Sequence, residues 1–316
     1  MKSVVITGAS GFIGKALTVK FLNDGYNVYG VIKNRKEKEH LPKHIRIHPI
    51  ICDFSDYENL SSYIHENIEY FVHLAWAGVS GVESRDIFVQ IQNIKAACMA
   101  LKQAHILQTK RFLFAGSSYQ YRMESYMRAN EEVFARKNVY GIAKQAGTDL
   151  LRAEAIETGI IFNSVLFTNV FGVGDYSMRS TNAIIKQLLN GEDLQLIDGR
   201  HKHDWTYIDD AVQGITAILN KGKDGKSYYV GDKELRLFSE IIQRVRDIVN
   251  PGSKLNFGCY NDDKGYIDYS YIDLEELRRD TGFECTTDFR ESILKTTEWV
   301  KVLEEKKNVK KITGGE

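Results

Sequence analysis

The sequence has few of the features that mark membrane or nucleic-acid-binding proteins. Its 316 residues include 42 lysines and arginines and 42 aspartates and glutamates, so the formal net charge is zero. Neither a polyanion nor a membrane surface is therefore implied as a partner. No apolar run approaches the roughly 20 residues that span a bilayer, and the N-terminus lacks the pattern of a signal peptide. We also find no internal repeat and no low-complexity linker.

Cysteine is scarce and widely spaced. Cys52, Cys98, Cys259 and Cys285 lie too far apart along the chain to form a metal-ligand motif. Free thiols in a reducing cytoplasm are the expected state of such residues. We therefore expect a cytoplasmic protein without a bound metal.

The first fourteen residues have the pattern of a nucleotide-binding turn. Val4–Ile6 is a β-branched run without polar alternation, which is typical of a strand buried on both faces. Gly8, Gly11 and Gly14 follow, and apolar residues then recur at four-residue spacing as far as Phe21. A glycine turn lets the backbone approach a pyrophosphate, and the helix N-terminus offers unpaired N–H groups. The alternative is an ordinary strand, turn and helix with glycines by chance.

Strands and helices alternate beyond this turn. Apolar runs predict further strands at 27–32, 45–51, 70–74, 111–115 and 160–167, and helical periodicity appears at 60–68 and 86–104. This alternation predicts an α/β fold with a doubly wound parallel sheet. Ligands are expected at the carboxyl ends of the strands.

The end of the second predicted strand bears on the choice of dinucleotide. An acidic residue there bonds the adenosine ribose of NAD, whereas a basic residue accommodates the 2′-phosphate of NADP. No Asp or Glu stands at this point, and Lys33, Arg35 and Lys36 follow the strand. The sequence therefore favours NADP, with NAD as the alternative, and a solvated charge run is the competing interpretation.

Tyr140 and Lys144 are candidate catalytic residues. Their four-residue spacing on a helix places both side chains on one face. A lysine ammonium stabilises a nearby phenolate and lowers the pKa of the tyrosine. Ser117, just after the strand at 111–115, is placed to orient a substrate oxygen. Such a triad exchanges a proton with a carbonyl or alcohol while a nicotinamide moves a hydride.

In these motifs the chain resembles an extended short-chain dehydrogenase/reductase of the nucleotide-sugar epimerase/dehydratase family. The matching segments are Thr7–Gly14, Cys52-Asp53, His73–Ala75, Gly116–Ser118, Tyr140–Lys144, Asn169–Gly172 and Asp204–Asp210. The resemblance implies a dinucleotide-binding Rossmann domain at 1–170, interleaved with part of 204–235. It also implies a smaller substrate-binding α/β domain at 171–303, and residues 304–316 lack any pattern and are expected to form a frayed tail.

The resemblance also implies which residues contact the ligands. The cofactor contacts include two cations at the end of the second predicted strand, Lys33 and Arg35. The full expected set is Gly8, Ser10, Gly11, Phe12, Ile13, Gly14, Lys33, Arg35, Asp53, Phe54, Leu74, Ala75, Trp76, Asn93, Tyr140, Lys144, Phe167, Asn169 and Val170. The substrate contacts are expected to be Trp76, Ser118, Tyr119, Asn169, Arg200 and His203.

Three departures from the family pattern affect the substrate contacts. Leu166 stands where the family usually has Arg, and His203 replaces the Arg of an Arg-Asp pair that helps to bind the diphosphate. Arg200 or Lys202 is a candidate replacement for that Arg. The loop at 123–137 lacks the family's prolines, so the selected sugar is not predicted.

The likeness leaves three functions open. Matching dehydratases have Asp-Glu after the triad hydroxyl residue, but Ser118 and Tyr119 follow Ser117, so dehydration is disfavoured. The cations at 33–36 and the run 115–118 favour NADPH-dependent reduction of a 4-keto-6-deoxyhexose nucleotide. The alternative is an NAD-dependent nucleotide-sugar 4-epimerase, and an inactive NADP-binding sensor is less favoured. The helix at 86–104 and the Tyr140 helix commonly pair across a dimer in this family, so a homodimer is expected.

Overall fold

A computed structural model describes residues 2–121, 138–178, 180–232, 234–260 and 267–312. The chain divides into two compact units, which are described separately. Unit 1 comprises 1–167, 212–230 and 267–284, and unit 2 comprises 168–211, 231–266 and 285–316. The return of residues 267–284 to unit 1 was not predicted from the sequence. Among the described residues, no helix combines the length and apolarity needed to cross a bilayer.

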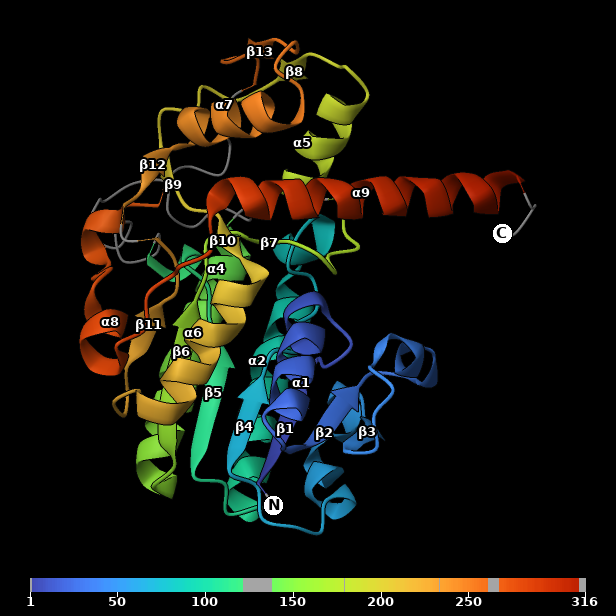
Figure 1. The fold of residues 1–316 in the computed structure, drawn as a ribbon. Helices are drawn as coiled ribbons and strands as arrows, with labels where there is room; N and C mark the ends of the chain where they lie inside the picture. Colours follow the sequence, from blue (N-terminus) through green and yellow to red (C-terminus); the bar gives the residue numbers. More distant parts are fainter. Residues whose placement is uncertain (1, 122–137, 179, 233, 261–266, 313–316) are drawn as a thin grey trace. The chain divides into compact units, whose positions relative to one another are not determined.

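Unit 1 is built on a seven-stranded parallel sheet. The strand order is β11-β6-β5-β4-β1-β2-β3 (Figure 1). The strands are β1 (Ser3–Thr7), β2 (Asn27–Ile32), β3 (Ile47–Ile51), β4 (Tyr70–His73), β5 (Arg111–Ala115), β6 (Ile161–Leu166) and β11 (Ser227–Tyr229). All neighbouring pairs in this sheet are parallel. The predicted doubly wound parallel fold is confirmed.

Helices cover both faces of this sheet. Figure 1 shows α1 (Phe12–Asn23) and the unit 1 part of α6 (Ile208–Lys221) on the near face, with α2 (Ile87–Ile106) behind it. Helix α4 (Val139–Thr158) packs on α2. Short 3₁₀ segments are η1 (Arg35–His40) after β2, η2 (Phe54–Tyr63) after β3, η3 (Val82–Arg85) before α2, and η5 (Tyr269–Tyr271) in the segment 267–284. The short helix α8 (Glu276–Thr281) also belongs to unit 1.

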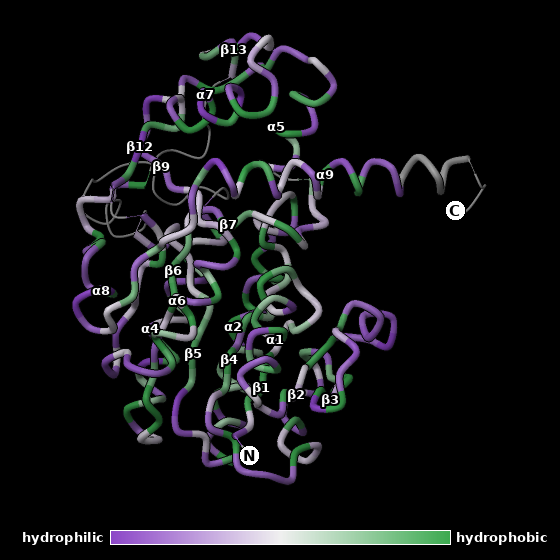
Figure 2. Tube along the Cα trace, in the orientation of Figure 1, coloured by the Kyte–Doolittle hydropathy of each residue, from purple (hydrophilic) through white to green (hydrophobic). Residues whose placement is uncertain are grey.

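The core of unit 1 lies between the sheet, α2 and α4. Phe71, Phe112 and Phe162 occupy matched positions on three adjacent strands and are fully buried. Adjacent rings stack at centroid distances of 5.3 and 6.5 Å, and burial of each ring contributes about 1.5–3 kcal/mol. Alanines of α2 at 96, 97, 100 and 104 let that helix approach closely. Figure 2 shows hydrophobic residues concentrated along these central strands.

Among its described residues, unit 2 contains three short strand pairs, three helices and the first residues of α6. The pairs are β7 (Val170–Phe171) with β10 (Thr206–Tyr207), β8 (Leu194–Gln195) with β13 (Leu255–Asn256), and β9 (Lys202–His203) with β12 (Arg236–Leu237). The helices α5 (Ser180–Leu189), α7 (Phe238–Val249) and α9 (Phe289–Ile312) pack on one another.

Two local predictions differ from the structure. The periodicity at 60–68 predicted an α-helix, but the chain forms η2 and becomes extended at Ile64. Residues 304–316 were expected to be a frayed tail, but α9 continues to Ile312. Glu304 anchors this part of the helix through an ion pair of 2.7 Å with Lys186 of α5.

Candidate dinucleotide and catalytic site

The glycine turn between β1 and α1 requires glycine at two positions. Gly8 has a φ of +69°, and a Cβ there would lie 3.0 Å from the backbone nitrogen of Ala75. At Gly14, a Cβ would lie 2.1 Å from the carbonyl oxygen of Gly8, so only glycine permits this close packing of α1. No described side chain caps the N-terminus of α1 at Gly11. The first N–H groups of α1 are therefore available to an anion, as a pyrophosphate requires.

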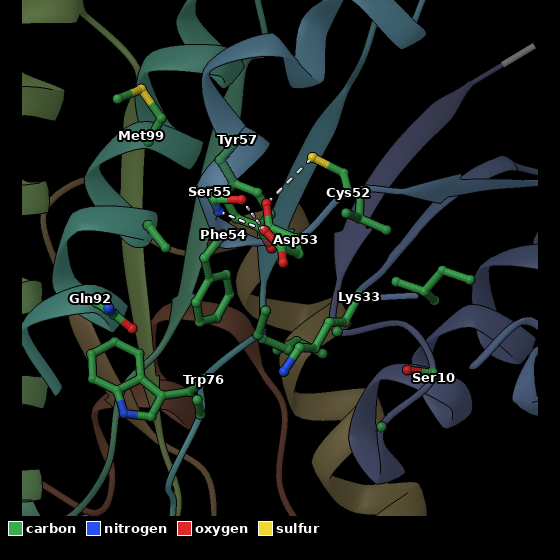
Figure 3. A pocket seen from close by; sticks show the side chains of 18 of the residues that line it. Ser10, Lys33, Cys52, Asp53, Phe54, Ser55, Tyr57, Trp76, Gln92 and Met99 are labelled. Atoms are coloured by element: carbon green, nitrogen blue, oxygen red, sulfur yellow. Dashed lines mark hydrogen bonds between the residues drawn. The ribbon is translucent and has the colours of Figure 1, made fainter. Parts of the chain in front are cut away.

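A cavity of about 780 Å³ opens at the carboxyl ends of β1 to β4, within the size range of small-molecule sites. Figure 3 shows the Phe54 ring, the Trp76 ring and the Lys33 ammonium directed into this space. The described lining residues are Gly8, Ser10, Gly11, Val31, Ile32, Lys33, Glu37, Cys52, Asp53, Phe54, Ser55, Tyr57, Glu58, Leu74, Ala75, Trp76, Ala77, Gln92, Lys95, Ala96 and Met99. The glycine turn, the uncapped helix and the size of the cavity fit a nicotinamide dinucleotide.

Nine of the predicted cofactor residues line this cavity: Gly8, Ser10, Gly11, Lys33, Asp53, Phe54, Leu74, Ala75 and Trp76. Other predicted contacts in unit 1 are not among its described lining residues, namely Phe12, Ile13, Gly14, Arg35, Asn93, Tyr140, Lys144 and Phe167. Asn169 and Val170 belong to unit 2. The ligand contacts themselves stay predictions.

Asp53 follows β3 at the edge of the cavity. Its Oδ1 atom accepts hydrogen bonds from the Ser55 hydroxyl at 2.6 Å and the Ser55 backbone N–H at 2.8 Å. These bonds, the hydroxyl bond first, lower the pKa of Asp53 below its ordinary value, so the carboxylate is ionised at neutral pH. The adjacent Phe54 ring packs edge-on against Tyr57 at 5.4 Å.

A carboxylate that the sequence analysis missed lies at the end of β2. The Asn34 side chain caps η1 by accepting hydrogen bonds from the backbone N–H groups of Lys36 and Glu37. This turn brings Glu37 Oε2 back to the glycine turn, where it accepts from the Ser10 hydroxyl at 2.7 Å and from the Lys33 backbone N–H at 3.2 Å. The detectable signal was Asn34 followed three residues later by Glu37, the spacing of a helix cap with an acidic partner.

Two side chains of α2 hold the loop after β4. Asn93 accepts a hydrogen bond from the Ala77 N–H and donates one to the Ala77 carbonyl, each at 2.8 Å. Gln90 accepts from the Trp76 indole N–H at 2.8 Å and donates to the Gly78 carbonyl at 3.0 Å. Asn93 was expected to contact the cofactor, and in this structure its amide binds the Ala77 backbone instead. Gln90 was not anticipated.

Lys144 is buried on α4 and surrounded by aromatic rings. Its Nζ atom donates to the Ala115 carbonyl at 2.7 Å and lies 3.7 Å from the centre of the Trp76 ring. The Tyr140 ring centre is 5.9 Å from the same nitrogen. Burial lowers the pKa of Lys144 well below its ordinary value. Trp76 therefore contacts both the dinucleotide cavity and Lys144 of α4.

Ser117 lies beyond β5 and is linked to α4 through neighbouring side chains. Its hydroxyl accepts from the Tyr119 backbone N–H at 3.3 Å, and the Tyr119 ring packs edge-on against Tyr140 at 6.2 Å. Gln120 bonds the Ser117 N–H at 2.8 Å and the Thr148 hydroxyl of α4 at 2.9 Å. The structure thus gathers Ser117, Tyr140 and Lys144 around the end of β5.

The structure shows the surroundings of two predicted substrate contacts, Ser118 and His203. Ser118 is fully buried and its hydroxyl donates to the Phe167 carbonyl at 2.9 Å, so this side chain belongs to the core. His203 was considered in place of a cationic Arg, but desolvation of its ring, with His201 beside it, lowers its pKa to about 4. The imidazole is therefore neutral at pH 7 and supplies no positive charge to a diphosphate.

The remaining substrate candidates of unit 2 are placed as follows. Arg200 is exposed, and its backbone N–H donates to Asp198 at 3.2 Å. The Asn169 amide donates to the Thr181 hydroxyl at 3.1 Å. Lys202 is exposed on β9.

The fold and the glycine-turn cavity agree with a comparison against known families. The sequence model named NAD dependent epimerase/dehydratase family matches residues 4–231. The chain belongs to this family. The resemblance recognised from the motifs is confirmed, and with it the prediction of an NAD(P)-dependent enzyme of the short-chain dehydrogenase/reductase type.

Relatives within this family share about a quarter of the residues. An uncharacterized UDP-glucose epimerase of Bacillus subtilis (strain 168), YtcB, is 25% identical over 92% of this chain and 95% of its own length. A CDP-abequose synthase of Yersinia pseudotuberculosis is 24% identical over 86% of this chain and 93% of its own. The UDP-glucuronic acid 4-epimerase of Bacillus cereus, solved with UDP-glucuronic acid and NAD, superposes with a TM-score of 0.76. It is 22% identical and covers 95% of this chain and 99% of its own, and this likeness shows the fold.

Proposed function

We propose that the chain exchanges a hydride between a nicotinamide dinucleotide and one carbon of a nucleotide-activated sugar. The observation that carries this is the gathering of Ser117, Tyr140 and Lys144 at the end of β5, with Trp76 shared between Lys144 and the dinucleotide cavity. The UDP-glucose epimerase and the CDP-abequose synthase named above support the choice of substrate class.

Each of the three residues has a separate role in this proposal. The dinucleotide, when bound, accepts or donates the hydride. The Tyr140 phenol oxygen takes the proton of the sugar hydroxyl in the oxidising direction and returns it in the reducing direction. Lys144 in its protonated form favours the phenolate form of Tyr140. The Ser117 hydroxyl, which already accepts one hydrogen bond, donates a hydrogen bond to the sugar oxygen and orients it.

Dehydration is not supported by the residues around Ser117. Removing a proton and a hydroxide from adjacent carbons needs an acid and a base in addition to the phenol. Ser118 follows Ser117, and its hydroxyl is committed to the Phe167 carbonyl. Tyr119 comes next, so this stretch offers no carboxyl group.

Two reactions remain, and one observation favours each. The Glu37 carboxylate at the end of β2 favours NAD, and a retained NAD suits 4-epimerisation, because that reaction has no net oxidation. Lys33 in the cavity lining favours NADPH and net reduction of a 4-keto-6-deoxyhexose nucleotide. We place 4-epimerisation first. An inactive sensor is disfavoured because Ser117, Tyr140 and Lys144 are all present.

The expected result of cofactor extraction is NAD in the purified protein, identified by mass spectrometry. Incubation with a panel of nucleotide sugars, without added cofactor, is expected to invert one hydroxyl-bearing carbon, as followed by proton NMR. Oxidation of added NADPH by a 4-keto sugar nucleotide would establish the reductase instead. If neither reaction occurs with any member of the panel, the proposed chemistry is wrong.

We also propose a homodimer formed through α2 and α4. Both helices expose apolar side chains on their outer surfaces: Ile87 is 49% exposed, Ile91 54% and Leu150 52%. Apolar positions repeated along two packed helices are typical of a protein–protein contact.

Replacing Ile91 by Asp and Leu150 by Asp together is expected to convert the dimer to a monomer, because each carboxylate would be desolvated in the contact. Light scattering at micromolar concentration measures the change in mass. Ile45→Asp, which alters a 92%-exposed residue before β3, is the matched control and should leave the mass unchanged. A wild-type protein that is already monomeric at this concentration would rule out the dimer.

A further inference from the structure

The segment after β2 folds so that an acidic side chain returns to the strand end. Asn34 Oδ1 accepts from the backbone N–H groups of Lys36 at 3.0 Å and Glu37 at 3.3 Å, which fixes the first turn of η1. This turn directs Glu37 back toward β2, and its carboxylate bonds the Lys33 backbone N–H. Glu37, five positions beyond β2, thereby lies beside the end of that strand, where an acidic residue of a dinucleotide fold binds the adenosine ribose.

The Glu37 carboxylate is held in place and still has acceptor capacity. Its Oε2 atom accepts both the Ser10 hydroxyl at 2.7 Å and the Lys33 N–H at 3.2 Å. Among the residues that the structure describes, Oε1 accepts no hydrogen bond, and Glu37 lines the cavity. An ionised carboxylate accepts about four hydrogen bonds in total. The geometry therefore leaves room for the hydroxyl groups of a ligand.

The charges around this end of the cavity disfavour a second phosphate. The acidic residues of the described lining are Glu37, Asp53 and Glu58, against the basic Lys33 and Lys95. A 2′-phosphate would add about two negative charges beside the Glu37 carboxylate.

We propose that Glu37 is the residue that selects NAD over NADP in this chain, by accepting hydrogen bonds from the adenosine ribose and repelling a 2′-phosphate. The inference rests on the proposed function only in assuming that the cavity holds a nicotinamide dinucleotide. It reverses the preference drawn from the sequence, which depended on the absence of an acidic residue at the end of β2. Arg35, one of the cations behind that preference, is exposed and is not among the described lining residues.

The test compares dissociation constants for NAD⁺ and NADP⁺, measured by isothermal titration on protein stripped of cofactor. We expect the wild type to bind NAD⁺ at least tenfold more tightly, since a hydrogen bond to a charged group is worth about a factor of ten or more. Glu37→Gln removes the charge and keeps hydrogen-bonding atoms, so NADP⁺ affinity is expected to rise while NAD⁺ affinity changes little. Glu37→Ala removes both, so NAD⁺ affinity is expected to fall about tenfold as well.

Glu39→Gln is the matched control, because Glu39 is an exposed acid on the same 3₁₀ segment and does not line the cavity. It should leave both dissociation constants unchanged. Thermal unfolding of each variant without ligand shows whether the fold is intact. An unchanged ratio of the two constants in Glu37→Gln, or a wild type that prefers NADP⁺, would overturn the assignment. These dissociation constants are measured without a nucleotide sugar. The proposed sugar reaction can therefore fail while the assignment of Glu37 still holds, and the reverse is also true.

Discussion

Replacing Tyr140 by Phe is expected to lower kcat about 10³-fold, the usual contribution of a positioned proton donor. The ring remains, so its edge-on contact with Tyr119 is preserved. Because Tyr140 is not among the described lining residues of the dinucleotide cavity, the dissociation constant for NAD⁺ should stay within about twofold, the lower end for the loss of one hydrogen bond. Steady-state turnover of the identified nucleotide sugar and titration with NAD⁺ measure the two quantities.

Tyr63→Phe is the control for this experiment. Tyr63 is a surface phenol on η2 that donates to Asp56 at 3.2 Å, so its loss removes a phenol without touching α4. Its kcat should equal that of the wild type. If Tyr140→Phe keeps kcat within tenfold of the wild type, another group donates the proton, and the assignment of Tyr140 is wrong.

Replacing Gly14 by Ala is expected to disrupt both stability and dinucleotide binding. The added Cβ would lie 2.1 Å from the Gly8 carbonyl oxygen and 3.0 Å from the Ala9 Cα, and all of these are backbone atoms. Helix α1 must therefore move away from the glycine turn, at a cost of about 3 kcal/mol, the upper end for overpacking a core. The same movement carries away the N–H groups that would bind the pyrophosphate.

Thermal unfolding and NAD⁺ titration measure these two effects. Gly147→Ala is the matched control, since Gly147 is also a buried helical glycine. A Cβ there would lie 3.6 Å from Phe114 and 3.7 Å from Trp76, which are ordinary contacts. Its unfolding midpoint should therefore equal or exceed that of the wild type. An unchanged midpoint and NAD⁺ affinity in Gly14→Ala would show that α1 is not packed as described.

The central strands β1, β4 and β5 were readable from the sequence because nearly all of their residues are buried, on both faces of the sheet. Val4–Ile6 has no polar alternation and lies in β1, and β2 and β5 have the predicted bounds. The segment at 60–68 was misassigned for a related reason. Leu60, Ile64 and Ile68 are all buried, as the periodicity implied, yet burial alone does not distinguish a helix from a 3₁₀ turn followed by extended chain.

At the C-terminus the error is the reverse: a helix forms as far as Ile312 where the sequence predicted none beyond about residue 304. Beyond Glu304 the residues are charged and have no apolar periodicity, so nothing local predicted a helix. Lysine and glutamate are nevertheless good helix formers, and the ion pair with Lys186 joins α9 to α5. A contact between residues more than one hundred positions apart gave the segment a partner that its own sequence does not reveal.

The sequence by itself determined the parallel α/β fold, the glycine turn and the spacing of Tyr140 and Lys144, because each depends on residues adjacent along the chain. The tertiary structure decided which side chains share a cavity. Glu37 meets Ser10 only because the Asn34 cap turns the chain back on itself, and Ser118 is lost to the core only because Phe167 lies beside it. The basic residues that follow β2 in the sequence favoured NADP, but the turn after Asn34 brings the acidic Glu37 to the same strand end.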